Sequence, residues 1–303
     1  MLTKYEPYQA KNALCRVDKN DEFNNSTYTL NPYRGCPVGC RYCFVQQKKY
    51  KDSTGLEEEK HKIVQVKINA PFLLRRKLSS GIEPAMICLG ESCEPFADIE
   101  DEYFITQRLL EILAEYNYPL HILTRYPRIL RDVDLIKRIN TKSEVYVTIS
   151  IPVVSAALSA KLEGDSPSVK DRLRTIRALN KNGIVAGVAI SPVIPYISDG
   201  EEVNKVLKKA SENGASYILL NPLVIKDYQR EMFFSWLADK YPGIVDSYKR
   251  LYKEDGYPGA EYWDVFISQA GETAAGLDLK IGLPYTSDKK NEQGLLRFTD
   301  HVR

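Results

Sequence analysis

The 303-residue sequence lacks the features that mark membrane, secreted and strongly charged proteins. No apolar run approaches the roughly 18–20 residues needed to span a bilayer, and the first residues lack the apolar stretch of a signal peptide. Lys and Arg number 42 and Asp and Glu number 40, so net charge does not draw the whole chain towards nucleic acid or an anionic membrane. We therefore expect a soluble, cytoplasmic protein with no membrane partner.

Histidine and cysteine are scarce, with three and six residues respectively. Six cysteines are too few for a secreted disulfide scaffold, and three of them, Cys36, Cys40 and Cys43, fall within eight residues. In a cytosolic chain such a cluster indicates metal binding or catalysis. Apolar residues make up 44% of the chain and aromatic residues are spread along it, which excludes disorder for most of its length.

Short apolar runs alternate with longer amphipathic segments over most of the chain, which predicts strands alternating with helices. The predicted strands are 27–30, 85–89, 120–124, 145–151, 184–190 and 217–220. The predicted helices between them are 68–79, 101–116, 131–140, 168–182 and 201–213. Strands joined in this way pair in parallel and form either an open doubly wound sheet or an incomplete β/α barrel. The periodicity does not choose between the two, but in both the site lies at the carboxyl ends of the strands.

Three segments are expected: an N-terminal segment over 1–26, the β/α unit over 27–222, and a helical extension over 223–303 packed on it. An extra strand is expected at 62–68, where apolar and polar residues alternate. Ser166 is the expected N-cap of the helix at 168–182, and Gly183 follows its end. The extension should contain helices near 231–239, 244–252 and 262–275.

The chemistry is concentrated in residues 31–44, NPYRGCPVGCRYCF, which begin where the first predicted strand ends. Three thiolates at C-x3-C-x2-C spacing can bind three irons of a four-iron cluster and leave the fourth iron open for chemistry. A structural zinc site or three incidental buried cysteines are the alternatives. Zinc would need a fourth ligand at short spacing, yet His61 lies 18 residues beyond Cys43 and the next cysteine is Cys88. We therefore favour the iron–sulfur cluster.

The cysteine motif, with an aromatic residue before its last Cys, resembles that of the radical S-adenosylmethionine (radical SAM) superfamily. The wider run is similar to the branch related to spore photoproduct lyase, and the similarity extends over about residues 27–275. Further segments that agree in order are LGESCEPFADIE, HILTRYPRILRDVDLI, VTISIPVVSAALSAKLEG, KDRLRTIRALNKNGI, AISPVIPYISD and REMFFSWLADKYP.

The resemblance implies a partial (β/α)6 TIM-like barrel that holds a [4Fe-4S] cluster on Cys36, Cys40 and Cys43, with S-adenosylmethionine (SAM) on the open iron. It also implies an external one-electron donor of the flavodoxin or ferredoxin type. Reductive cleavage of SAM would then give a 5′-deoxyadenosyl radical that abstracts hydrogen from a substrate. No cysteine-rich C-terminal segment resembles those that hold auxiliary clusters, so a second cluster is not expected.

Gly90 and Glu91 follow the second predicted strand, where the superfamily often has a glycine–glutamate pair that contacts the amino group of SAM. A carboxylate suits an ammonium group; a helix-capping acidic cluster is the alternative, because further acidic residues follow. Many members of the branch read Gly-Thr-x-Thr-Asp-Pro-Tyr here, a departure that bears on the local geometry.

Other expected cofactor contacts lie near the ends of later strands, and each has a structural alternative. The small polar residues Thr124, Thr148 and Ser150 could contact the carboxylate or ribose of SAM, or simply pack. Arg172 could contact the ligand or pair with Glu163. The apolar Val188 and Ile190 could pack on adenine or in the core. Tyr42 could shield the cluster or anchor its loop. The expected contacts are Tyr42, Thr124, Thr148, Ser150, Arg172, Val188 and Ile190.

The sequence leaves the substrate open, and a nucleic-acid base or lesion is one candidate. Basic candidates for a phosphate track are Lys48, Lys49, Lys51, Arg75, Arg76 and Lys77, and stacking candidates are Tyr33, Tyr126 and Tyr196. Solvated helix faces and barrel packing are the favoured explanation of these residues. Cys93 is a candidate hydrogen-atom donor, with packing as the alternative. A non-catalytic iron–sulfur or zinc module for binding or sensing is the alternative function, and Glu91 with an open iron argues against it.

Overall fold

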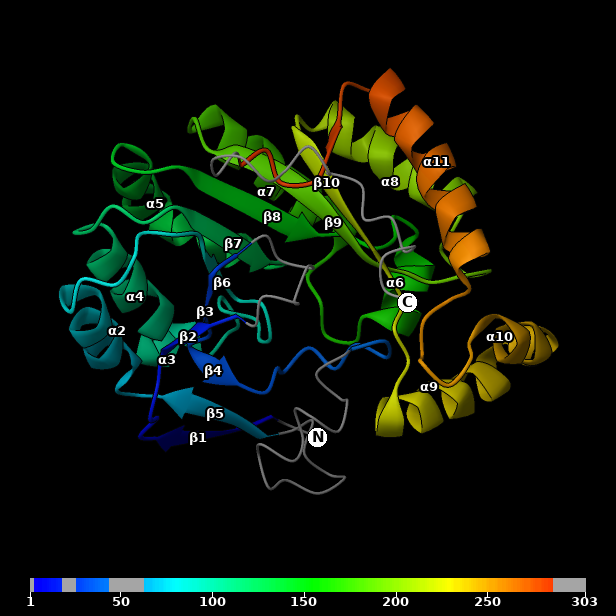
Figure 1. Cartoon of the computed structure of the whole chain (residues 1–303), viewed down its shortest axis with the longest axis horizontal. Coiled ribbons are helices and arrows are strands. Elements are labelled where there is room, and N and C mark those ends of the chain that lie inside the picture. Colours follow the sequence, from blue (N-terminus) through cyan, green and yellow to red (C-terminus); the bar gives the residue numbers. More distant parts are fainter. Residues whose placement is uncertain (1–2, 18–25, 44–62, 286–303) are drawn as a thin grey trace.

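The computed structural model describes residues 3–17, 26–43 and 63–285, which form two sheets surrounded by helices (Figure 1). The strands are β1 (Lys4–Tyr8), β2 (Leu14–Arg16), β3 (Tyr28–Leu30), β4 (Tyr33–Arg34), β5 (Ile63–Lys67), β6 (Ile87–Leu89), β7 (Leu120–Thr124), β8 (Val145–Ser150), β9 (Val185–Val193), β10 (Tyr217–Pro222) and β11 (Lys280–Ile281). The helices are α2 (Ala70–Ser79), α3 (Glu100–Tyr103), α4 (Ile105–Leu113), α5 (Val133–Asn140), α6 (Ala156–Leu162), α7 (Val169–Lys181), α8 (Glu201–Glu212), α9 (Asp227–Lys240), α10 (Val245–Leu251) and α11 (Ala260–Gly276), with 3₁₀ turns η3 (Pro127–Asp132) and η4 (Pro242–Ile244).

The large sheet decides between the two predicted architectures. Its order is β11-β10-β9-β8-β7-β6-β3-β2, and the run from β3 to β10 is parallel. These parallel strands stand beside one another in chain order, whereas a doubly wound sheet reverses its order at a switch point. Helices α2, α4, α5 and α8 lie around the outside of the curved sheet (Figure 1). The partial barrel is therefore confirmed, with all six predicted strands present.

The two faces of the barrel sheet carry different residues because side chains alternate along a strand. Ile122, Val147 and Val188 are fully buried against the helices. His121, Thr148 and Gly187 are one residue out of phase, so they occupy the opposite face, called here the inner face. The Tyr217 ring covers Gly187 so closely that a Cβ on Gly187 would lie 2.5 Å from the ring. The inner face near the amino end of β9 is therefore filled by side chains.

Several boundaries differ from the expected ones for local reasons. The helix expected over 101–116 is divided into α3 and α4 at Phe104, whose φ is 52°. Ser168, not Ser166, caps α7 by accepting a hydrogen bond from the Asp171 amide, so the Ser166 prediction is wrong. Gly183 lies after α7 with a φ of 72°, as expected of a residue that ends a helix.

Segments outside the six-strand unit add to both sheets. The extra strand expected at 62–68 is β5, which lies between β1 and β4 in the small sheet. The three helices expected in the extension are α9, α10 and α11, and β11 then returns to pair with β10. The division into three segments remains a prediction. Within the described part of the chain, no helix combines the length and the apolar character that a membrane span requires.

Candidate active site

The cysteine loop leaves β4 and turns sharply at two glycines. Gly35 has a φ of 88°, and a Cβ on it would lie 2.8 Å from the Ile63 carbonyl oxygen, so only glycine fits this close approach. Gly39 has a φ of 72°. The Cys43 amide donates to the Cys40 carbonyl oxygen at 3.3 Å, which curls the end of the motif back on itself. Cys40 is buried, while Cys36 and Cys43 are partly buried.

The loop is fastened to the turn between α6 and α7. The Arg41 amide donates to the Leu162 carbonyl at 2.9 Å, and the Asp165 amide donates to the Val38 carbonyl at 3.1 Å. Gly164 lies so close that a Cβ there would be 2.2 Å from the Val38 oxygen. The Glu-Gly-Asp sequence at 163–165 therefore contains the glycine that lets this turn contact the cysteine loop.

Arg125 extends from the end of β7 to the buried cysteine. Its Nη1 lies 3.1 Å from the Cys40 Sγ and also 3.1 Å from both the Glu163 Oε1 and the Ser166 Oγ. Its Nη2 lies 3.4 Å from the Ser150 Oγ, and only 15% of its side chain is exposed. The structure thus brings together two residues that are 85 positions apart in the sequence.

Glu163 and Arg172 form a fully buried ion pair, which is the alternative that the sequence offered for Arg172. The Arg172 Nη1 and Nη2 donate to the two carboxylate oxygens at 2.8 and 2.7 Å. The Ser159 hydroxyl donates to the Glu163 Oε2 at 2.6 Å, and the Tyr42 hydroxyl donates to the Glu163 Oε1 at 3.3 Å. Burial raises the pKa of Glu163, but the hydrogen bonds from Arg172 and the charge of Arg125 outweigh it, and the pKa is lowered. Two guanidinium groups therefore share one carboxylate.

The loop after β6 supports the end of β7. Gly90 has a φ of 89°, and a Cβ on it would lie 2.5 Å from the Leu123 carbonyl oxygen. Buried Glu94 accepts hydrogen bonds from the Thr124 hydroxyl and, at 3.0 Å, from the Arg125 amide. Glu91 is partly buried and directly follows Gly90. In the sequence, Glu94 was only one of the acidic residues after Glu91 that could form a capping cluster, and its role was missed because its partners come from another strand.

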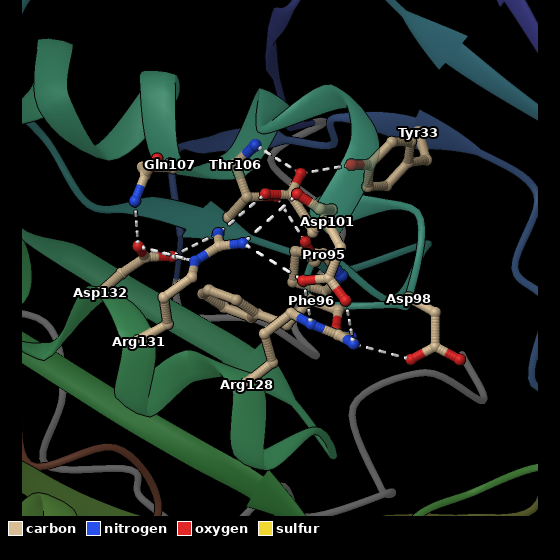
Figure 2. A network of polar contacts seen from close by, with 11 residues as sticks. Tyr33, Pro95, Phe96, Asp98, Asp101, Thr106, Gln107, Arg128, Arg131 and Asp132 are labelled. Carbon is tan, nitrogen blue, oxygen red and sulfur yellow. Dashed lines mark hydrogen bonds and ion pairs between the residues drawn. The ribbon is translucent and has the colours of Figure 1, made fainter.

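A second polar network fixes the start of the cysteine loop (Figure 2). Buried Glu100 accepts hydrogen bonds from the Tyr33 hydroxyl, from the Thr106 amide at 2.7 Å and from the Arg131 Nη2 at 3.1 Å. Arg128 pairs with Asp98 at 2.9 Å beside it. Tyr33 is only 2% exposed, so the structure uses this predicted stacking residue to join β4 to the helices.

The remaining expected cofactor contacts do not all reach the same face. Ser150 lies beside Arg125, and Thr148 lies deeper on the inner face, where its Oγ1 is 2.7 Å from both the His121 Nε2 and the Tyr217 hydroxyl. Val188 and Ile190 are fully buried on the helix-packed face, so their side chains are directed away from Ser150. Thr124 also lies on the helix-packed face, and its hydroxyl donates a hydrogen bond to Glu94.

The two scattered cysteines near β6 occupy different places. Cys88 is fully buried in the strand, one residue out of phase with the helix-packed Leu89. Cys93 is 8% exposed, and its Sγ lies 3.6 Å from the Asn31 Oδ1. Burial raises the pKa of both thiols. Cys93 remains a predicted hydrogen-atom donor, and its observed contact is with the segment that leads into the cysteine loop.

The predicted nucleic-acid contacts are mostly occupied or buried. Tyr126 is 9% exposed, whereas Tyr196 is 48% exposed. Arg75 pairs with Glu115, and the Arg76 guanidinium lies 5.7 Å from the Phe72 ring centroid. Lys48, Lys49 and Lys51, together with Phe44 and His61, lie outside the described residues.

The described side chains around the cysteine loop do not form a site for a single metal ion, but their charges suit an anionic iron–sulfur cluster. Among residues 3–17, 26–43 and 63–285, no three His, Cys, Asp or Glu side chains converge as ligands of one metal ion. Burial raises the pKa of Cys36 to about 12 and also raises that of Cys40, so both thiols are neutral at pH 7 without metal. The guanidinium beside Cys40 is only partly neutralised by Glu163, so an anionic thiolate-bound group would complete the charge balance.

Comparison with known proteins shows the family of this chain. The family model of the radical SAM superfamily matches residues 30–214. A Mycobacterium tuberculosis protein described as uncharacterised is 30% identical over 238 residues, which cover 78% of this chain and 70% of that protein. The "Radical SAM Nalpha-GlyT isomerase" of Pseudomonas phage M6 is 27% identical over 281 residues, 92% of this chain and 53% of that protein.

The fold is similar to that of solved radical SAM enzymes. The structure of spore photoproduct lyase complexed with dinucleoside spore photoproduct superposes with a TM-score of 0.65 at 14% identity, covering 90% of this chain and 78% of that one. The family model matches the cysteine loop and the barrel strands through β9, and the fold is that of a partial barrel. This chain belongs to the radical SAM superfamily.

Proposed function

We propose that this protein is a radical SAM enzyme that reductively cleaves SAM and uses the product radical to abstract hydrogen from a substrate. The observation that carries the proposal is the cysteine loop, in which Cys36, Cys40 and Cys43 surround a turn at Gly39 beside a buried guanidinium. Cys36, Cys40 and Cys43 would hold a [4Fe-4S] cluster, which would supply one electron to bound SAM and so give the 5′-deoxyadenosyl radical. Electrons would come from a flavodoxin- or ferredoxin-type donor.

The residues of this chain have separate tasks in that chemistry. Glu91, which follows Gly90 at the carboxyl end of β6, would accept hydrogen bonds from the SAM ammonium. Ser150 and the Arg125 guanidinium supply donors for a carboxylate at the ends of β8 and β7. Tyr42 is 5% exposed and its hydroxyl donates to the Glu163 Oε1 at 3.3 Å, so it would anchor the end of the loop beside the cluster.

We propose a nucleobase derivative as the first substrate class to test. The support is the printed names of two similar proteins, one an isomerase of Nalpha-GlyT and one a lyase solved with a dinucleoside photoproduct. Tyr196, in the loop after β9, is the one of the three predicted stacking residues with an exposed ring. Exposed aromatic rings stack on bases without sequence preference. Thymine photoproduct oligonucleotide is therefore the probe, and the undamaged oligonucleotide is its control.

The deciding experiment is anaerobic reconstitution followed by an assay for 5′-deoxyadenosine with SAM and dithionite. The parent should take up about four irons and four sulfides per chain. Cys36→Ala, Cys40→Ala and Cys43→Ala should each lose the stable four-iron cluster, whereas Cys15→Ala, which alters an exposed cysteine on β2, should keep it.

The outcomes separate the alternatives. Formation of 5′-deoxyadenosine only with SAM and a reduced cluster supports the proposal. Stoichiometric zinc without iron uptake contradicts it. A four-iron cluster that never cleaves SAM favours the non-catalytic binding or sensing module instead.

A further inference from the structure

We infer that Arg125 is a tuning residue for the proposed cluster: its guanidinium donates a charge-assisted hydrogen bond to the Cys40 sulfur and raises the cluster's reduction potential. The inference rests on the proposed function, because it requires a cluster on Cys40. It starts from the 3.1 Å separation between the Arg125 Nη1 and the Cys40 Sγ. Cys40 is also the buried member of the cysteine motif, so this contact lies in a weakly screened environment.

The Arg125 side chain is held at its backbone end and at its guanidinium end. The backbone amide of Arg125 donates to the Glu94 Oε2 at 3.0 Å, which fixes the start of the side chain at the end of β7. At the other end, Nη1 also contacts Glu163 and Ser166, each at 3.1 Å. A long side chain held by this many partners loses no further rotamer freedom when it donates to sulfur.

Local charge balance gives the direction of the effect. Arg125 and Arg172 contribute two positive charges, and Glu163, which contacts both, contributes one negative charge. These three side chains together therefore carry one excess positive charge beside the cysteine loop. Reduction adds an electron to the cluster, so a nearby positive charge and a hydrogen bond to a ligand sulfur both favour the reduced form.

A purely structural role would give a different result. If Arg125 only joined β7 to the α6–α7 turn, its loss would lower stability or iron content but leave the potential of the assembled cluster unchanged. Hydrogen bonding and charge at the sulfur instead predict a shift whose sign follows the charge that is removed. The midpoint potential therefore separates the two roles without an activity measurement.

The experiment is a redox titration of the reconstituted cluster without SAM, monitored by EPR. Arg125→Gln should shift the midpoint potential by 59 mV or more in the negative direction. This shift corresponds to a tenfold or larger change in the one-electron equilibrium constant. Arg125→Lys keeps the charge and should stay closer to the parent. Arg128→Gln is the matched control: it removes the same charge at a side chain 19% exposed that pairs with Asp98, and should leave the potential unchanged.

Glu163→Gln provides an arm of opposite sign, because it leaves both guanidinium groups without their carboxylate and should raise the potential. A potential equal to that of the parent in Arg125→Gln or Glu163→Gln, whichever assembles four irons, overturns the inference. An equal shift in Arg128→Gln also overturns it, since the effect would then be one of overall charge. A parent that takes up no iron contradicts the proposed function itself, and the inference with it.

Discussion

The buried carboxylate of Glu163 should be one of the most costly single groups to replace in this protein. It is fully buried and accepts five hydrogen bonds, two of them from Arg172 and one from Arg125. Glu163→Gln keeps nearly the same shape but removes the only charge that compensates the two guanidinium groups in this network. Removing one partner of a buried ion pair costs about 3–5 kcal/mol, because the other partner stays buried and uncompensated.

Urea unfolding measures this cost, provided that the parent and the variant give the same m-value. Glu115→Gln is a matched control, because Glu115 forms a two-pronged pair with Arg75 that is about half exposed. Exposed pairs of this kind contribute little, so the control should unfold almost like the parent. Equal losses in the two variants would refute the assignment of Glu163 as the buried counter-ion of this network.

This stabilisation should also depend on pH. The pKa of Glu163 is lowered below its ordinary value of 4.5 in the folded state, so the stabilisation is present above pH 4.5 and is lost as pH falls through the lowered pKa. Glu163→Gln should therefore be less acid-sensitive than the parent. A parallel pH dependence of the two unfolding free energies below pH 4.5 would contradict this.

Three further predictions concern the scaffold around the site. Gly90→Ala should lower the unfolding free energy by more than Gly81→Ala, because both glycines have positive φ but only Gly90 would bring a Cβ against a backbone carbonyl of β7. The backbone strain alone costs about 1–2 kcal/mol in either variant. Equal losses in thermal unfolding would contradict this. Burial lowers the pKa of His121 to about 3, so the folded state does not bind the proton that the unfolded chain takes up, and the free energy of unfolding falls as pH drops below 6.5. His121→Leu should remove about 2 kcal/mol of this pH dependence between pH 6.5 and 5, measured by urea unfolding, and an unchanged slope would refute it. Cys93, 8% exposed with a raised pKa, should be alkylated slower than exposed Cys15 by about tenfold or more, as peptide mass spectrometry would show; equal rates would place Cys93 at an accessible surface.

The strands and the cysteine motif could be predicted because their signals are local. The run at 120–124 matches β7 residue for residue, since a buried parallel strand is a continuous apolar run. The same property hid which side chains face inward. Strand β9 is apolar on both faces, so the sequence did not show that Val188 packs on the helices and Gly187 on the inner face.

Contacts between distant segments could not be predicted from one sequence. Arg125 and Glu94 were visible as charged residues near strand ends, but their partners come from other strands and loops. Strands β4 and β11 have two residues each, too few to show any periodicity. The Glu163–Arg172 pair was an open alternative because two opposite charges nine residues apart, one at the end of α6 and one in α7, do not reveal from the sequence whether both are buried.

Pairing of β2 and β11 at the two margins of the barrel sheet has a consequence for solubility. An incomplete barrel has two lateral edges, and each edge strand offers unpaired amide and carbonyl groups to another molecule. β2 pairs antiparallel to β3 over three residues, and β11 pairs with β10 over two. Both edge strands are short, so each offers few free backbone groups for intermolecular sheet extension, and β11 pairs with only the first two residues of β10.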